Sequence, residues 1–218
     1  MHTNMAVIHH TTMTPTKLEL LASWLPAQPW YAGPEAPAPT NAGGFRLDDP
    51  EGEVGIEFMV VADDRDGAPV AHLVPMTYRG APLEGAEQGL IGTSEHGVLG
   101  TRWIYDGTHD PVLVTQLLAL LRGDAVPQAQ SLTDTPDETV TASAETAAVP
   151  ADPGTWTVHH DEAGTRITLE KATLHIHRAL TATTQPAEAA QGHVTAGWTP
   201  EAGTETRSAF VTLHPTTR

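Results

Sequence analysis

The stretch that most constrains the fold is Leu20–Gly33, LLASWLPAQPWYAG. Its pattern predicts the end of a short helix, followed by a proline that breaks the helix and by an aromatic pair. Apolar residues recur at helical spacing just before and within this stretch, at Leu18, Leu21, Ala22 and Leu25. We expect Thr14 to cap this helix, because its side chain can accept from free amides, and Pro15 to occupy the first position. Pro26 should end the helix, because an interior proline removes a backbone hydrogen bond.

The aromatic pair Trp30 and Tyr31 has two interpretations. Both side chains bury large areas, so they suit a plug of core aromatics. The alternative is a recognition surface on which a ligand stacks. The sequence leaves both open.

Strand patterns follow on both sides of a second helix. We expect strands at Gly55–Ala62, Ala68–Tyr78, Thr101–Tyr105, Thr155–His160, Thr165–Glu170, Thr173–Ala179, Val194–Trp198 and Ser208–His214. Pro75 should lie at a sheet edge or a bulge. The second helix, Val112–Arg122, is predicted by Asp110 as its cap, Pro111 at its first turn and Gly123 just beyond its end.

Composition excludes several classes of partner. The 218 residues carry a formal net charge of -16, which disfavours nucleic acid and anionic membranes because both require basic surfaces. The chain has no cysteine, so it forms no disulfide or thiolate site. The sequence shows no membrane-spanning run and no signal peptide, so we expect a cytoplasmic protein.

Several motifs resemble the N-terminal cap of bacterial maltokinases. Trp24–Gly33, WLPAQPWYAG, resembles the opening of that cap, and Leu73–Arg79, LVPMTYR, resembles the end of its long strand. Leu90–Thr93, LIGT, and Tyr105–Leu121, YDGTHDPVLVTQLLALL, resemble its closing segments. The resemblance covers residues 14–123.

A later stretch resembles the first strands of a kinase N-lobe. In Arg166–Leu180, RITLEKATLHIHRAL, His175 occupies the position aligned with the lysine that contacts nucleotide phosphates in such lobes. A neutral imidazole does not replace that fixed charge. The sequence ends at Arg218 without the motifs of a catalytic C-lobe. The resemblance therefore implies a cap-like binding module and not a working kinase.

These patterns predict an α+β fold, with a mostly antiparallel sheet, two to three helices packed on it and a small β-rich block after it. The predicted division is a cap-like domain at 14–123, an acidic Pro/Ala/Thr-rich linker or long loop at 124–153, and the N-lobe-like block at 154–218.

Twelve histidines raise the question of a metal site. His175 and His177 point to one face of a strand, and His159 and His160 precede them by one or two strands. A zinc site on this face is an alternative to a solvent-facing polar row, and the row is favoured because no third ligand is fixed beside the pair.

The sequence contains no motif of a serine hydrolase or of a phosphate-binding loop. Ser94 and Ser208 have no GxSxG context, and no phosphate-binding glycine loop is present. We therefore expect no catalytic residue, no cofactor and no bound metal.

The sequence favours a non-catalytic protein that binds a protein or sugar partner beside α-glucan, trehalose or maltose metabolism. The alternatives are a small metal-dependent enzyme or sensor that uses the His175/His177 face, and a subunit that completes a sugar kinase.

Overall fold

Antiparallel strand pairing dominates the structure, a computed structural model that describes residues 13–65, 68–132, 134–181, 186, 189–199 and 205–216. The strands are β1 Met13–Thr14, β2 Thr40–Leu47, β3 Gly55–Arg65, β4 Ala68–Arg79, β5 Leu90–His96, β6 Gly100–Asp106, β7 Gln128–Ala129, β8 Thr141–Ala144, β9 Thr157–Asp161, β10 Gly164–Thr168, β11 Ala172–Ile176, β12 Ala179–Leu180, β13 Gly192–Trp198 and β14 Thr206–Pro215. The helices are α1 Lys17–Trp24 and α2 Pro111–Arg122, with short 3-10 turns η1 Leu25–Ala27, η2 Glu87–Gly89, η3 Gly107–His109 and η4 Thr146–Ala148.

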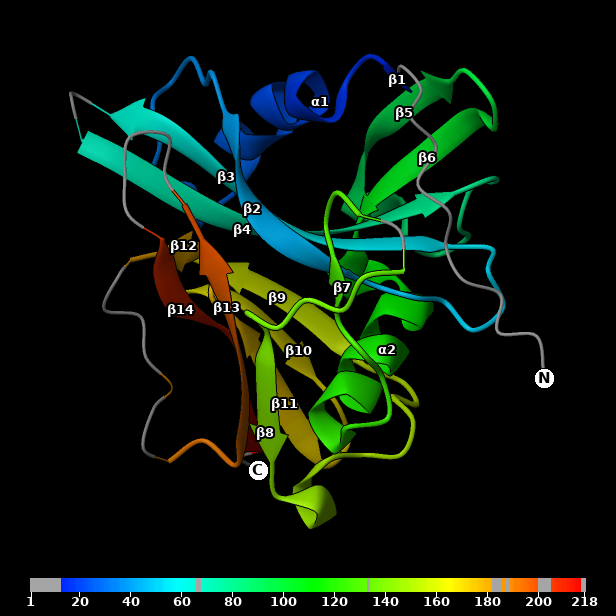
Figure 1. The fold of residues 1–218 in the computed structure, drawn as a ribbon, viewed down its shortest axis with the longest axis vertical. Coiled ribbons are helices and arrows are strands. Elements are labelled where there is room, and N and C mark those ends of the chain that lie inside the picture. Colours follow the sequence, from blue (N-terminus) through cyan, green and yellow to red (C-terminus); the bar gives the residue numbers. More distant parts are fainter. Residues whose placement is uncertain are drawn as a thin grey trace.

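The strands of the described residues form one sheet of order β1-β5-β6-β4-β3-β2-β13-β14-β11-β10-β9. Figure 1 shows its first six strands with α1 in the upper part of the molecule and β8 to β11, β13 and β14 with α2 in the lower part. We call the upper part the N-terminal half, residues 13–110, and the lower part the C-terminal half, residues 111–216.

Among the described residues, strand pairing joins the two halves at three places, one of which is the pairing of β7 with β2. Trp198 of β13 pairs with Gly43 of β2, and β12 returns from the C-terminal half to pair with His72 and Ala71 of β4. Gly44, beside Gly43, has a φ of 120°, and a Cβ built there would lie 1.9 Å from the carbonyl oxygen of Phe58. Only glycine therefore allows β2 to approach β3 this closely.

Strand β3 is buried on both faces. Alternate residues enter the core that the halves share, namely Ile56, Phe58, Val60 and Ala62. The residues between them, Met59 and Val61, enter a smaller core under α1 with Leu21, Leu25 and Trp30. This follows from the period of two along a strand.

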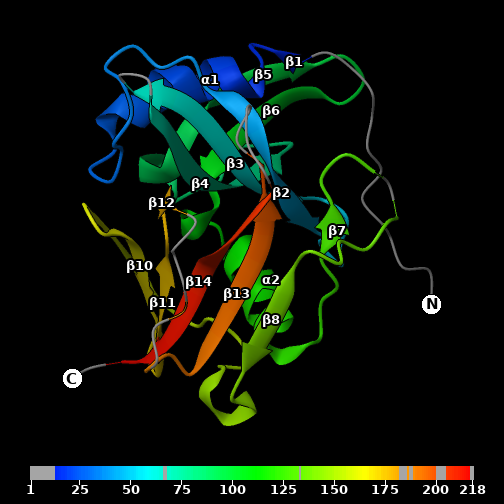
Figure 2. The same cartoon turned by 60° about the vertical axis from the view of Figure 1, so that its left-hand side comes forward.

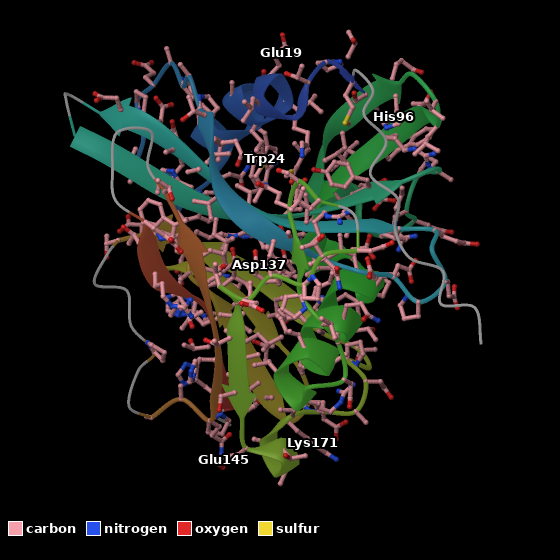
Figure 3. The ribbon with its side chains drawn as sticks, in the orientation of Figure 1. Glu19, Trp24, His96, Asp137, Glu145 and Lys171 are labelled. Atoms are coloured by element: carbon pink, nitrogen blue, oxygen red, sulfur yellow. The ribbon has the colours of Figure 1, made fainter. Side chains whose placement is uncertain are left out.

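Helix α1 covers the smaller core, and Figure 3 shows Trp24 beneath it. Its N-cap is Thr16, not the predicted Thr14: Thr16 and Glu19 form a capping box. The T-x-x-E spacing was the stronger signal. The α-helix ends at Trp24, before Pro26, as predicted.

Helix α2 forms as its end signals indicate. Asp110 accepts a hydrogen bond from Val112 N–H, Pro111 opens the helix, and Gly123 ends it in the left-handed conformation. Most of its apolar side chains enter the shared core. The helix packs against β8 and β13, behind which it is seen in Figure 2.

The predicted α+β class is wrong. Within the described residues the fold is β-rich, with a 14-stranded antiparallel sheet and two α-helices. The physical reason is that strands, not helices, cover most of the shared core: the C-terminal half folds its own strands over the face of β2, β3 and β4 and leaves room there for α2 alone.

Most predicted strands are confirmed, with ends shifted by a few residues. Pro75 pairs with Phe58 of β3 and lies between the part of β4 that pairs with β12 and the part that pairs with β6. A residue without an N–H fits such a gap. Asp66 and Gly67, between β3 and β4, lie outside the described residues.

Residues 124–153 carry two short strands: β7 pairs with β2 and β8 pairs with β13. Val140 and Val149 are buried in the shared core. The division into a linker and two flanking units stays a prediction. None of the described helices is long and apolar enough to cross a membrane.

Candidate functional site

Arg178, between β11 and β12, is a fully buried charge, and its side chain is 0% exposed. Its Nη2 donates to Oδ2 of Asp106 at 2.5 Å, and its Nε donates to Oγ1 of Thr165 at 2.8 Å. The guanidinium lies 4.8 Å from the centre of the Trp30 ring. Arg178 thus joins β6 of the N-terminal half to β10 of the C-terminal half.

Burial and charge shift the pKa values of Asp106 and Arg178 in opposite directions. Burial alone raises the pKa of Asp106, but Arg178 and hydrogen bonds from Thr108 outweigh it and hold the pKa below its usual range. Burial lowers the pKa of Arg178 and Asp106 opposes that shift, so the guanidinium keeps its charge. The result is a sealed ion pair with its hydrogen bonds satisfied.

Two histidines extend this pair toward the surface. Nε2 of His109, at the end of η3, lies 3.3 Å from Nε2 of His160 on β9. Nδ1 of His160 lies 2.9 Å from Oγ1 of Thr165, the same hydroxyl that Arg178 contacts. Burial lowers the pKa of both imidazoles, while the charge of Asp106 opposes the shift. We call Asp106, His109, His160, Thr165 and Arg178 the junction network.

His109 of the junction network lines a groove around Trp156. Nε1 of Trp156 donates to the carbonyl of Thr108 at 3.1 Å, which fixes the half-buried indole against η3. Two hollows share the segment Gly154–Thr157. One, of about 590 Å³, is also lined by Leu83–Ala86, Gln88 and His109. The other, of about 710 Å³, is also lined by Pro150–Pro153 and Thr168–Lys171; Figure 3 labels Lys171 at the lower end of the molecule.

The predicted metal residues His175 and His177 lie together on β11 and just beyond it, with ring centres 4.5 Å apart. His175 Nε2 lies 3.1 Å from the carbonyl of Ala163, and His177 Nε2 lies 3.1 Å from Oγ1 of Thr212. Burial, then the nearby histidines, lowers the pKa of His177 to about 4. No group of three or more metal-ligating side chains is found among the residues that the structure describes.

His159 and His160 are neighbours on β9, and the structure places them differently. The His159 side chain is 65% exposed, 3.7 Å from Asp161. His160 is half-buried in the junction network. His159 and His160, which the sequence placed one or two strands from the His175/His177 face, therefore differ in exposure and in partners.

Trp30 and Tyr31, the alternative recognition surface, also differ in exposure and in contacts. Trp30 is 2% exposed, between Trp24 and Arg178. Tyr31 is half-buried with its ring centre 4.9 Å from that of His72, whose Nε2 accepts from Ala32 N–H. Burial lowers the pKa of His72 to about 4, against the opposing charge of Asp63.

The sequence interpretation missed most of the junction network. One signal for Arg178 was present: it continues the even-numbered series of Leu174 and Ile176, the buried face of β11. A charged side chain on the buried face of a strand needs a buried partner. No local pattern identifies that partner, because Asp106 lies 72 residues earlier.

Comparison with known families supports the resemblance found in the sequence. Residues 24–110 match the family model of the maltokinase N-terminal cap domain. A search of curated proteins found no match to the chain. The matched segment includes Asp106 and His109, whereas His160, Thr165, Arg178 and Trp156 lie outside it. The N-terminal half of this chain, from Trp24 to Asp110, is therefore similar to the maltokinase N-terminal cap domain.

Proposed function

We propose that the protein is a non-catalytic binding module associated with maltose, trehalose or α-glucan metabolism, and that the groove around Trp156 binds its sugar. The observation that carries this proposal is the position of the groove. It lies where the segment similar to the cap domain meets the C-terminal half, and His109 and the Thr108 carbonyl of the matched segment contribute to it.

The chemistry of the groove suits a neutral sugar. A pyranose ring has faces of C–H groups and a rim of hydroxyls, so it needs an aromatic surface and a few polar partners. Trp156 offers the aromatic ring, held at its N–H end, and the polar partners come from the lining side chains, among them Asp152, Glu170, Lys171 and Gln88. The net charge of -16 repels anionic ligands.

The non-catalytic part of the proposal draws on His175. Burial lowers the pKa of this imidazole, and its Nε2 contacts the carbonyl of Ala163. At neutral pH it therefore carries no fixed positive charge to offer a nucleotide phosphate in place of a lysine.

The test is a calorimetric titration of the whole protein with maltose and maltotriose at pH 7.5. We expect saturable binding of the α-linked sugars and binding of the β-linked disaccharide cellobiose at least tenfold weaker. Trp156→Ala should weaken maltose binding at least tenfold. Tyr31→Ala is the matched control and should bind as the wild type does.

Two results would contradict the proposal. Loss of binding in Tyr31→Ala with Trp156→Ala intact would move recognition to the Trp30/Tyr31 surface. Turnover of maltose with ATP and magnesium by the protein alone would show that it is catalytic.

A further inference from the structure

The two imidazoles of the junction network face each other head-on. Their Nε2 atoms are 3.3 Å apart and their ring centres 5.6 Å apart, a difference of about two ring radii, so the two nitrogens lie close to the line between the rings. A zinc ion on that line, bound at the usual ~2.0–2.1 Å, would need nitrogens about 4 Å apart. The arrangement therefore fits one proton held between the imidazoles.

The neighbouring groups set the direction of this hydrogen bond. The Arg178 guanidinium can only donate, so Oγ1 of Thr165 accepts from it. With the threonine proton donated to Nδ1 of His160, His160 is the tautomer protonated on Nε2 and donates to Nε2 of His109; we infer this tautomer for the pair. His109 carries its own proton on Nδ1. The chain of donors runs from the buried arginine to the wall of the groove.

Added protons break this chain. A proton on Nδ1 of His160 opposes only the threonine proton, because His160 still donates from Nε2, whereas a proton on Nε2 of His109 removes the acceptor and leaves two N–H donors facing each other. Burial favours the neutral state of the pair, while the charge of Asp106 attracts a proton; the charge of Arg178 and, at His160, that of His159 oppose this attraction. Glu84 lines the same hollow as His109.

We propose that the hydrogen bond between His109 and His160 is a pH-dependent latch that holds the Gly154–Val158 segment against η3 at neutral pH and releases it when the pair is protonated. This inference rests on the proposed function for its consequence, because release would move Trp156 and weaken ligand binding in acid. The depressed pKa of both imidazoles, caused first by burial, agrees with the closed state at neutral pH.

The test is hydrogen–deuterium exchange of the full chain without sugar, at pH 7.5 and 5.5, corrected for intrinsic exchange rates. In the wild type we expect protection of residues 154–161 to fall at least tenfold at the lower pH, since coupling to one proton amounts to tenfold per pH unit. His109→Gln and His160→Gln should each reduce this difference to less than threefold. His159→Gln, a change on the exposed side of the same strand, should keep it.

Equal protection of the wild type at both pH values, or an unchanged tenfold difference in His109→Gln, would overturn the latch. Imidazole nitrogen NMR of the wild type is a second measurement that needs no variant. It should show His160 protonated on Nε2 and His109 on Nδ1 at pH 7.5; the reverse tautomers would also overturn the proposal. Because no sugar is present, failure of the latch is distinguishable from failure of sugar binding at pH 7.5.

Discussion

Glu57 and Asp106 are both buried carboxylates, and their partners differ in exposure. Glu57 of β3 accepts from Lys17 Nζ at 2.9 Å, from Gln130 at 2.8 Å and from the Tyr78 hydroxyl. The Lys17 side chain is 33% exposed. Asp106 pairs with Arg178, whose side chain is fully buried.

The two carboxylates therefore have different structural roles. We call the contacts of Glu57 with Lys17 the anchor, and the Asp106–Arg178 pair the joint. Glu57 holds the first residue of α1 to the sheet, and solvent can replace part of what Lys17 supplies. Asp106 and Arg178 join the two halves where water does not reach, and they interact electrostatically with a pair of titratable imidazoles. The same type of interaction therefore has different energetic and pH-dependent consequences in the two places.

The largest difference is expected from removing the arginine. Arg178→Met leaves Asp106 buried without its counter-charge, and breaking a buried pair in this way costs ~3–5 kcal/mol. The free energy of unfolding from urea denaturation measures this loss. Arg166→Met is the control, since Arg166 is 45% exposed beside Asp161 and should cost less than ~1 kcal/mol. Equal losses in the two variants would mean that the junction is not sealed.

Acid should act on His72 and on Glu57 in different pH windows. The pKa of His72 is about 4 in the folded protein, against an ordinary value of 6.5, so the unfolded chain binds more protons as pH falls below 6.5. Stability is therefore lost progressively between pH 6.5 and 4, by about 3 kcal/mol for this group. The pKa of Glu57 is lowered from 4.5, with burial opposed by Lys17, Tyr78 and Gln130, so its contribution is lost only below pH 4.5.

Urea denaturation at half-unit pH steps measures both windows. His72→Gln retains an acceptor for Ala32 N–H and should flatten the decline that begins below the ordinary histidine pKa. His159→Gln, on the exposed side of β9, should leave the decline unchanged. A decline that persists in His72→Gln would be assigned to other histidines, first to His177, whose pKa is also lowered to about 4.

The smallest effect is expected at the anchor. Lys17→Met removes one partner of Glu57 but leaves Tyr78 and Gln130, and Lys17 is partly exposed, so we expect a loss of about 1 kcal/mol. Thermal unfolding of the variant beside Lys171→Met, a change at the distant groove, measures it. A loss as large as that of Arg178→Met would remove the distinction between anchor and joint.

Local signals in the sequence predicted the elements whose ends are marked by side chains. Asp110, Pro111 and Gly123 predicted α2, and runs of apolar residues predicted β3 and β4. The sequence interpretation predicted no strand at β2. Its Gly43 and Gly44 oppose strand propensity, and pairing with β3 overrides that propensity.

The fold class and the site required information that lies far apart in the chain. The number of strands that cover the shared core depends on pairing between β2 and β13 and between β4 and β12, which no local pattern encodes. The cap resemblance identified the N-terminal half, but it could not show that Arg178 contacts Asp106. The histidine pattern identified a real concentration of imidazoles and assigned importance to His175 and His177, whereas His160 makes the buried contacts.

Because the two faces of β3 belong to different cores, the strand also limits how this gene can change in length. Insertion of one codon within Gly55–Arg65 would turn every later side chain of the strand to the opposite face and place Met59 or Val61 where Phe58 or Val60 packs. Both cores would be damaged by one event. Substitutions can be compensated one neighbour at a time, but a frame-preserving insertion here cannot.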